Sequence, residues 1–172
     1  PRLGCIGAGH GHETSHSRDS LGAESNSTGK LGNWWTPEGL AHFQEASKRL
    51  VEEFNAYEPL PGIHVNGEQT LGENIADVAG LAVAFDAYQL ALGGKALPVV
   101  DGLTGDQRFF LAFAQGWRQK AREAALRQQI VTNEHAPSRE RAQTVRNIDP
   151  WYQAYEVKPG EKLFLAPEER VR

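Results

Sequence analysis

The chain lacks several features that mark particular classes of protein. Its 172 residues contain one cysteine, Cys5, so no disulfide can form within the chain and the redox compartment stays open. No apolar run approaches the roughly 20 residues that span a bilayer, and no signal peptide is recognisable. Acidic residues (22) outnumber basic ones (18), and the formal net charge is −4. Without a basic stripe to neutralise phosphates, nucleic acid is not expected as the main partner.

The composition is otherwise that of an ordinary globular domain. Hydrophobic residues make up 40% of the chain and charged residues 23%. A length of 172 residues suits one domain with a substantial core, so residues 1–172 are expected to form a single unit. Because the first residue is proline rather than methionine, we expect a fragment or a processed chain.

Apolar residues recur mainly at helical spacing. Thr36 before Pro37 supplies an N-cap followed by a suitable first helical residue. Thr104-x-x-Gln107 is a capping-box pattern that opens another helix. The pattern predicts helices over residues 37–57, 70–92 and 105–129, and a short one from residue 149.

Two stretches predict little regular structure. The first eleven residues contain four glycines and make a poor helix start, and residues 17–33 are typical of a loop. Asn66-Gly67 is a turn signal that favours a short hairpin before the second long helix. The expected fold is therefore mainly α-helical, with at most a short β-hairpin.

One short stretch has the pattern of a metal-dependent hydrolase. In His12-Glu13-Thr14-Ser15-His16, the two histidines lie four residues apart, so on a helix their imidazoles can converge on one cation. Zn²⁺ binds imidazole nitrogens at about 2.0–2.1 Å, and a catalytic site leaves one position for water. Glu13 is the residue type that accepts a proton from that water. The alternative is a solvated, His-rich segment, because chance also produces the H-E-x-x-H pattern.

A second stretch, more than fifty residues downstream, offers further candidate ligands. Glu73 and Asp77 lie four residues apart at the start of the second predicted helix. A catalytic zinc needs a third protein ligand, which Glu73 can supply, and Asp77 can accept the far ring N–H of His12. Glu73 also has a purely structural interpretation, because Thr70-x-x-Glu73 is a capping-box pattern. The upstream motif favours the ligand.

These two motifs resemble the neprilysin and endothelin-converting-enzyme family of zinc metallopeptidases, especially its bacterial oligopeptidases. The resemblance covers nearly the whole chain through residues 33–38, 57–62, 64–67, 102–110, 146–152 and 167–172. Family members are several times longer, so this chain resembles their C-terminal catalytic portion. The resemblance implies a zincin-type (thermolysin-like) helical domain, one Zn²⁺ per chain, peptide substrates and a periplasmic or extracellular location.

The resemblance also implies roles for two residues in segment 135–141. His135 would stabilise the tetrahedral intermediate of peptide hydrolysis, and Arg141 would bind carbonyl groups of the substrate backbone. By residue type and loop placement alone, His135 is equally well interpreted as a loop histidine without a role. Arg139 and Arg146 are expected to be surface charges.

Several positions depart from the family pattern. Relatives carry an aromatic residue and two acids where this chain has Arg18-Asp19-Ser20, an aromatic and an acid at Ser25-Asn26, and an aromatic at Glu140. We expect Arg18, Ser25, Asn26 and Glu140 to face parts of the longer proteins, so that polar residues there reduce exposed apolar surface. Burial of these side chains would contradict that explanation.

The leading interpretation is a zinc-dependent endopeptidase domain that cleaves oligopeptides through a metal-activated water. One alternative is a zinc-binding scaffold with little or no activity, because the family's substrate-pairing strand and helical cover are absent from this chain. A second alternative is a helical interaction domain without a metal. The sequence leaves peptide preference and oligomeric state open.

Overall fold

The structure is a computed structural model that describes residues 3–19, 21–32 and 35–171. Throughout these ranges the regular structure is helical and strand pairing is limited to isolated bridges, which confirms the mainly α expectation. Ser20, Asn33, Trp34 and Arg172, which the sequence comparison used, lie outside the described residues. The elements are a π-helical turn (Leu3–Gly7), α1 (Ala8–Ser15), 3₁₀ turns His16–Arg18 and Gly22–Glu24, α2 (Pro37–Asn55), α3 (Leu71–Leu92), α4 (Gly105–Gly116), α5 (Glu123–Thr132), α6 (Ser138–Arg141), a 3₁₀ turn Ala142–Asn147 and α7 (Asp149–Tyr155).

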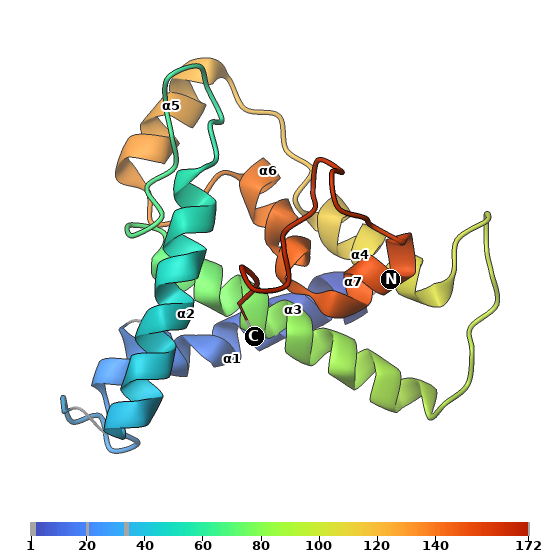
Figure 1. The fold of residues 1–172 in the computed structure, drawn as a ribbon, viewed down its shortest axis with the longest axis horizontal. Helices are drawn as coiled ribbons and strands as arrows, with labels where there is room; N and C mark the ends of the chain where they lie inside the picture. The colour runs from blue at the N-terminus through green and yellow to red at the C-terminus, as the bar shows by residue number, and fades with distance from the viewer. Residues whose placement is uncertain (1–2, 20, 33–34, 172) are drawn as a thin grey trace.

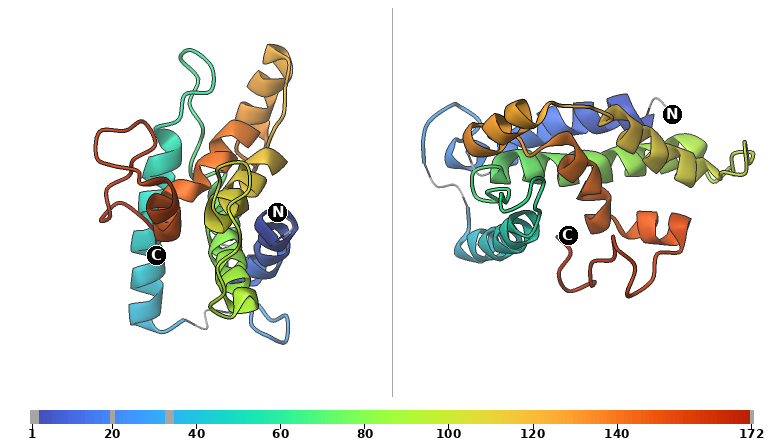
Figure 2. Two further views of the ribbon diagram at one scale, coloured as in Figure 1. Left: turned by 90° about the vertical axis from the view of Figure 1, so that its right-hand side faces the viewer. Right: turned by 90° about the horizontal axis from the view of Figure 1, so that it is seen from above.

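Helix α3 is the element against which the others pack. Helix α1 runs alongside it and α2 crosses it steeply near its N-terminal end (Figures 1 and 2). Toward the other end of α3, Phe85 stacks on Phe110 of α4 with ring centroids 5.1 Å apart, and Tyr88 stacks on Phe109 at the same distance. This aromatic cluster, together with fully buried Leu81, fixes α3 as the centre of the hydrophobic core.

Helix α3 is also long and apolar enough, by length and composition, to meet the criterion for a membrane span. That is weak evidence, because the buried core helix of a water-soluble protein passes the same test. The packing of α1, α2 and α4 on α3 accounts for its apolar composition. The expected lack of a membrane-spanning segment stays a prediction.

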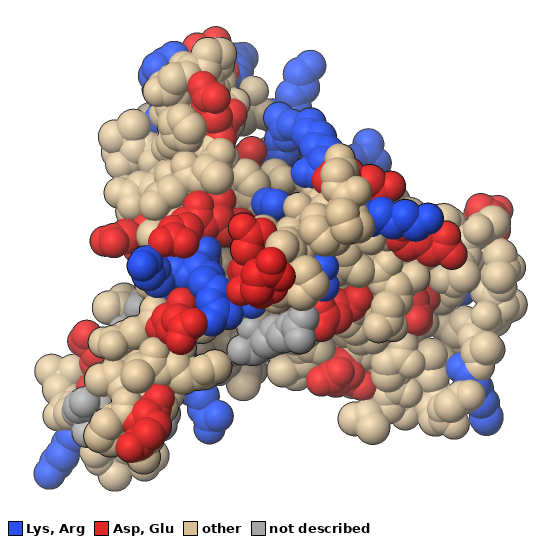
Figure 3. Space-filling view, viewed as in Figure 1, with Lys and Arg blue, Asp and Glu red and all other residues tan. Residues whose placement is uncertain are grey.

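Charges of both signs are interspersed on the face of the molecule shown in Figure 3. No continuous basic stripe crosses that face, in keeping with the net charge of −4. A surface of this kind gives phosphates no extended run of partners.

Helices α1 and α3 meet backbone to backbone at two glycines. A Cβ on Gly11 would lie 2.7 Å from the carbonyl oxygen of Gly80. A Cβ on Gly80 would lie 2.7 Å from the carbonyl oxygen of Ala8 and closer still to the backbone nitrogen of His12. The prediction of a poor helix start over residues 1–11 is therefore wrong, because close packing on α3 outweighs the low helix propensity of glycine.

The helix start signals are confirmed, whereas one predicted end is wrong. The hydroxyl of Thr36 accepts the N–H of Gly39, and Thr104 and Gln107 form both halves of a capping box. The helix that begins there ends at Gly116 rather than near residue 129, and α5 begins only at Glu123. The chain leaves the helix at Trp117, whose ring lies 4.2 Å from the guanidinium of Arg141.

The hairpin expected at Asn66-Gly67 does not form. The side-chain oxygen of Asn66 instead accepts the backbone N–H groups of Glu68 and Gln69, each at 3.1 Å. The resulting turn leads directly into α3.

Arg146, expected on the surface, is half-buried between α2 and the C-terminal segment. Its guanidinium donates to the hydroxyl of Tyr57 at 2.8 Å and to the carbonyl oxygens of Leu163 and Phe164 at 3.3 and 3.4 Å. It also lies 3.4 Å from the buried carboxylate of Glu53. The surface expectation fails because the last residues of the chain fold back over this side chain.

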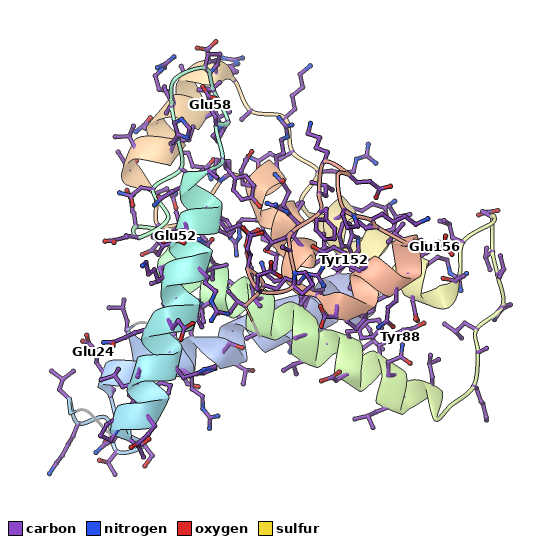
Figure 4. All side chains as sticks on the ribbon, viewed as in Figure 1. Glu24, Glu52, Glu58, Tyr88, Tyr152 and Glu156 are labelled. Atoms are coloured by element: carbon purple, nitrogen blue, oxygen red, sulfur yellow. The ribbon has the colours of Figure 1, made fainter. Side chains whose placement is uncertain are left out.

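Tyr152 of α7 anchors that C-terminal segment and lies beside it in Figure 4. Its hydroxyl donates to the carbonyl oxygen of Arg146 at 2.8 Å and accepts the N–H of Leu165 at 3.0 Å. The guanidinium of Arg170 stacks 3.5 Å from the centre of the tyrosine ring. These contacts hold the segment against the core.

Gly80→Ala is expected to lower the free energy of unfolding by about 1–3 kcal/mol, the usual cost of forcing volume into a packed interior. The added methyl group meets backbone atoms of α1, which cannot rotate away as a side chain can. Gly9→Ala is the control, because nothing lies within 4 Å of its Cβ position and alanine favours the helix. Urea unfolding followed by circular dichroism measures both variants. Equal stability of the two would show that the helix pair does not depend on this contact.

Candidate metal centre

Helix α1, the 3₁₀ turn that follows it and helix α3 bring two imidazoles and one carboxylate together: His12 lies in α1, His16 begins the turn and Glu73 lies in α3. The Nε2 atoms of His12 and His16 lie 3.1 Å apart. One oxygen of Glu73 lies 3.2 Å from His12 Nε2, and the other lies 3.5 Å from His16 Nε2. All three donor atoms point toward one common space, although they come from helices far apart in the sequence.

Each histidine is oriented by a carboxylate on its opposite nitrogen. His12 Nδ1 lies 2.8 Å from Asp77 Oδ1, and His16 Nδ1 lies 2.6 Å from Asp19 Oδ2. Because a carboxylate only accepts, both Nδ1 atoms carry protons, and neutral rings then present Nε2 lone pairs to each other and to Glu73. The hydrogen bond to Asp77 raises the pKa of His12 above its usual value, although burial acts in the opposite direction.

Asp19 is the orienting residue that the sequence analysis did not identify. Burial alone would raise the pKa of its carboxyl, but hydrogen bonds from the Gly22 N–H and from His16 lower the pKa below its usual value. A second N–H, from Leu21, holds the same carboxylate in place at 2.9 Å. The spacing of three residues after His16 was the available signal, because it places an acid on the adjoining turn.

The three donor atoms have the spacing that a zinc ion requires. Tetrahedral ligands at about 2.0–2.1 Å from Zn²⁺ lie roughly 3.3–3.4 Å from one another. The two Nε2 atoms are 3.1 Å apart, Glu73 Oε2 lies 3.2 Å from His12 Nε2 and Glu73 Oε1 lies 3.5 Å from His16 Nε2, and these separations bracket that value. Three acceptors facing each other also repel unless positive charge lies between them. His12, His16 and Glu73 therefore fit a zinc ion both in geometry and in charge.

Glu73 does not form the capping box that its spacing allowed. The hydroxyl of Thr70 accepts from the side chain of Asn74 and donates to the carbonyl of Asn66, so the first turn of α3 has no side-chain cap. The Glu73 carboxylate faces the histidines instead.

Arg141 lies beside the donor cluster and is buried. Its Nε and Nη2 donate to the two oxygens of Asp77 at 2.7 and 2.8 Å, and its Nη2 also lies 3.5 Å from Glu73. Together with the stacking on Trp117, these bonds hold the guanidinium still. Arg141 thus supports the carboxylate that orients His12.

His135 also reaches the cluster. Its Nε2 lies 3.0 Å from a carboxylate oxygen of Glu73, and its side chain is 39% exposed. The loop before α6 therefore places this imidazole against the donor cluster, at the edge open to solvent.

A pocket of about 260 Å³ opens beside the cluster. Glu13 is exposed and lines this pocket together with His12, His135, Arg141 and Trp117. The walls also include small residues of α1, which leave room next to the imidazole of His12. The candidate base Glu13, the candidate ligand His12 and the candidate substrate arginine Arg141 thus share one concave space.

The sequence model of peptidase family M13 matches residues 2–171. The chain belongs to peptidase family M13. Among its family relatives, the neutral endopeptidase of Lactobacillus helveticus is 37% identical over 169 residues, which is 98% of this chain and 24% of the relative. Endothelin-converting enzyme 1 of Cavia porcellus is 36% identical over 166 residues, which is 94% of this chain and 22% of the relative.

Solved structures of M13 relatives share this fold. The zinc metalloprotease Zmp1 of Mycobacterium tuberculosis, solved in complex with an inhibitor, superposes with a TM-score of 0.95 at 44% identity, covering 99% of this chain and 27% of that one. PepO of Lactobacillus rhamnosis gives a TM-score of 0.82 at 37% identity, covering 98% and 25%. The chain therefore spans about a quarter of the length of these M13 relatives.

The positions that depart from the family pattern differ in burial. Arg18 and Asn26 are exposed and Ser25 is half-buried, as expected for residues that face outward. Glu140 is 4% exposed, so the proposed explanation is wrong for this residue. Helix α6 runs between the buried residues Ala136 and Thr144, and this burial raises the pKa of the Glu140 carboxyl.

Glu140→Gln is expected to raise the free energy of unfolding by about 1 kcal/mol near pH 8. The folded chain holds the Glu140 proton more tightly than the unfolded chain, so wild-type stability is lost as pH rises above the ordinary glutamate value of 4.5. The advantage of the variant should therefore shrink as pH falls toward 4. Urea unfolding from pH 4 to pH 8 measures this, with exposed Glu68→Gln as the control. A constant difference between Glu140→Gln and wild type across that range would contradict the assignment.

Proposed function

We propose that residues 1–172 form the catalytic domain of a zinc-dependent endopeptidase that hydrolyses oligopeptides. The observation that carries this proposal is the convergence of His12, His16 and Glu73 at zinc-ligand spacing beside a pocket lined by Glu13. Membership of peptidase family M13 supports peptides as the substrate class.

Each residue has a role that its surroundings support. His12, His16 and Glu73 hold the ion, while Asp77 and Asp19 keep the two imidazoles oriented. Bound there, Zn²⁺ would polarise the peptide carbonyl and lower the pKa of a water molecule. Glu13 accepts the proton of the attacking water and passes it to the leaving amine.

Two further residues act on the substrate. His135 lies at the open edge of the cluster, where a ring N–H can donate to the oxyanion of the tetrahedral intermediate. Arg141 uses Nε and Nη2 to hold Asp77, so Nη1 is the atom that remains to donate to a substrate carbonyl in the pocket. These two roles position the peptide rather than form or break bonds.

A zinc-binding scaffold with little activity is the second candidate. It is favoured by one observation, namely that residues 1–172 match only about a quarter of the length of their relatives. Substrate positioning can contribute several kcal/mol to catalysis, so its loss would slow turnover without affecting zinc binding. By family resemblance alone, we place the protein in the periplasm or outside the cell, which cell fractionation tests.

Glu13→Gln is expected to lower the rate of peptide hydrolysis by about 10²–10⁴-fold, the usual contribution of a general base. Zinc content should stay unchanged, because Glu13 lies outside the donor cluster. Hydrolysis of a short quenched fluorescent peptide, with and without a chelator, measures the rate, and exposed Glu24→Gln is the control. A Glu13→Gln variant with full zinc content and the wild-type rate would exclude Glu13 as the base. Wild-type protein that binds zinc but cleaves no peptide would favour the scaffold.

Two substitutions are expected to lower the affinity for zinc by different amounts. Asp19→Asn removes the charge that orients His16 and should cost about 10–100-fold in affinity, the usual effect of losing an outer partner of a ligand. Glu73→Ala removes a donor atom and should cost more. Competition with a chromophoric chelator measures both, and Asp86→Asn, exposed on α3, is the control. Unchanged affinity in Glu73→Ala would mean that Glu73 is not a ligand.

A further inference from the structure

Beside the donor cluster lies a second group of potential ligands that the proposed mechanism does not use. It consists of Glu134, His135 and the Glu73 oxygen nearest to them, and one donor atom from each lies within 4.8 Å of the others. The closest pair is His135 Nε2 and Glu73 Oε2, at 3.0 Å. Glu134 is exposed, so this group is open to solvent.

A contact with Asn133 determines which nitrogen of the neutral His135 ring carries the proton. The side-chain oxygen of Asn133 accepts the backbone N–H of His135 at 2.8 Å, which sets the orientation of the amide group. The same oxygen lies 2.9 Å from His135 Nδ1, so Nδ1 carries a proton and donates it. In the neutral ring, Nε2 then directs a lone pair at the carboxylate of Glu73. Two acceptors 3.0 Å apart need a positive charge between them, either a proton on Nε2 or a metal cation.

The charge balance around this position favours a cation. Glu13, Glu73, Asp77 and Glu134 bring four carboxylates to the two donor groups and the pocket that they share. Arg141 is the cationic side chain that the described part of the chain pairs with them, and two of its nitrogens are already bonded to Asp77. One Zn²⁺ at the first site leaves negative charge on the side of Glu134.

Glu73 lies between the two groups of potential ligands. Its Oε1 lies 3.5 Å from His16 Nε2, whereas its Oε2 lies 3.2 Å from His12 Nε2 and 3.0 Å from His135 Nε2, so Oε2 is the atom that both groups would share. In sites that hold two metal ions, shared ligands place the ions about 3.5–4 Å apart. One imidazole with two carboxylates is a donor set that suits borderline divalent ions such as Zn²⁺.

We propose that Glu134, His135 and Glu73 form a second, weaker divalent-cation site, and that Zn²⁺ bound there inhibits the protein. The second site should hold its ion less tightly than the first, because one of its three ligands is exposed whereas all three ligands of the first site are half-buried. An ion on His135 Nε2 takes the place of the proton that this nitrogen needs in order to donate to the oxyanion, so the ring can no longer stabilise the intermediate. The inhibition rests on the proposed peptidase function, whereas the binding of the second ion does not.

Equilibrium dialysis of the chelator-stripped protein against Zn²⁺ tests the binding. Wild type should bind two Zn²⁺ ions per chain, one tightly and one more weakly. Glu134→Gln should bind the weaker ion at least about 10–100-fold less tightly, because removing even an outer hydrogen-bond partner of a ligand costs that much affinity. The tightly bound ion should be retained. Glu168→Gln, which removes the same charge from an exposed position at the other end of the chain, should bind as wild type. Co²⁺ in place of Zn²⁺ should give two sets of visible absorption bands in wild type and one in Glu134→Gln.

Three results would overturn the site. Wild type that binds a single Zn²⁺ would mean that a proton on His135 neutralises Glu73. A second ion that Glu134→Gln binds as tightly as wild type would be held by other residues. Loss of both ions in Glu134→Gln would place Glu134 in the first site or in the fold.

Peptide hydrolysis under rising Zn²⁺ tests the inhibition separately. Wild type and Glu168→Gln should lose activity as the weaker site fills, and Glu134→Gln should keep its basal activity at the same Zn²⁺ concentration. Equal inhibition of Glu134→Gln and wild type would overturn the inhibitory role. If no variant cleaves peptide, the proposed function fails, while the dialysis result still decides whether the second site exists.

Discussion

The candidate metal centre depends on how closely two helix backbones approach each other. Its candidate ligands come from α1, from the 3₁₀ turn that follows α1 and from α3, and these side chains can meet only if the two helices are in contact. Gly11 and Gly80 remove the side chains that would hold the backbones apart. Glycine weakens an isolated helix by roughly 1 kcal/mol, and here that cost is offset by the packing of α1 on the long, apolar α3. The same two residues thus set the fold and the donor spacing.

Around this contact, the polar groups form a continuous chain of ionic partners. Asp19 holds His16, the two histidines and Glu73 face one another, and Asp77 joins His12 to Arg141. Each outer carboxylate fixes the tautomer of a ring, so both inner nitrogens are acceptors. Such a set of converging acceptors is unfavourable by itself and favourable around a cation. Zinc binding and local folding should therefore be coupled.

The segment that carries His135 and Arg141 combines two functions. Arg141 is packed between Trp117 and Asp77 and holds the carboxylate that orients His12, whereas the side chain of His135 is partly exposed to solvent. The same segment also carries two acidic residues in different surroundings: Glu140 is buried in the interior and Glu134 is exposed at the surface. The expectation that polar residues here face outward does not explain the buried Glu140, whereas the exposed Glu134 adds negative charge beside His135 and Glu73.

The sequence by itself determined the ligand types, the pairing of His12 with His16 on one helical face, the caps of α2 and α4 and the mainly helical class, because these depend on residues close together in the chain. Only the tertiary structure decided that Gly11 of α1 is a contact point, that α4 ends at Gly116, that Arg146 is half-buried and that Glu140 is buried. It also decided that Asp19 supports His16 and that Glu73 faces both His16 and His135. These features depend on how close two segments come, and local spacing carries no information about that distance.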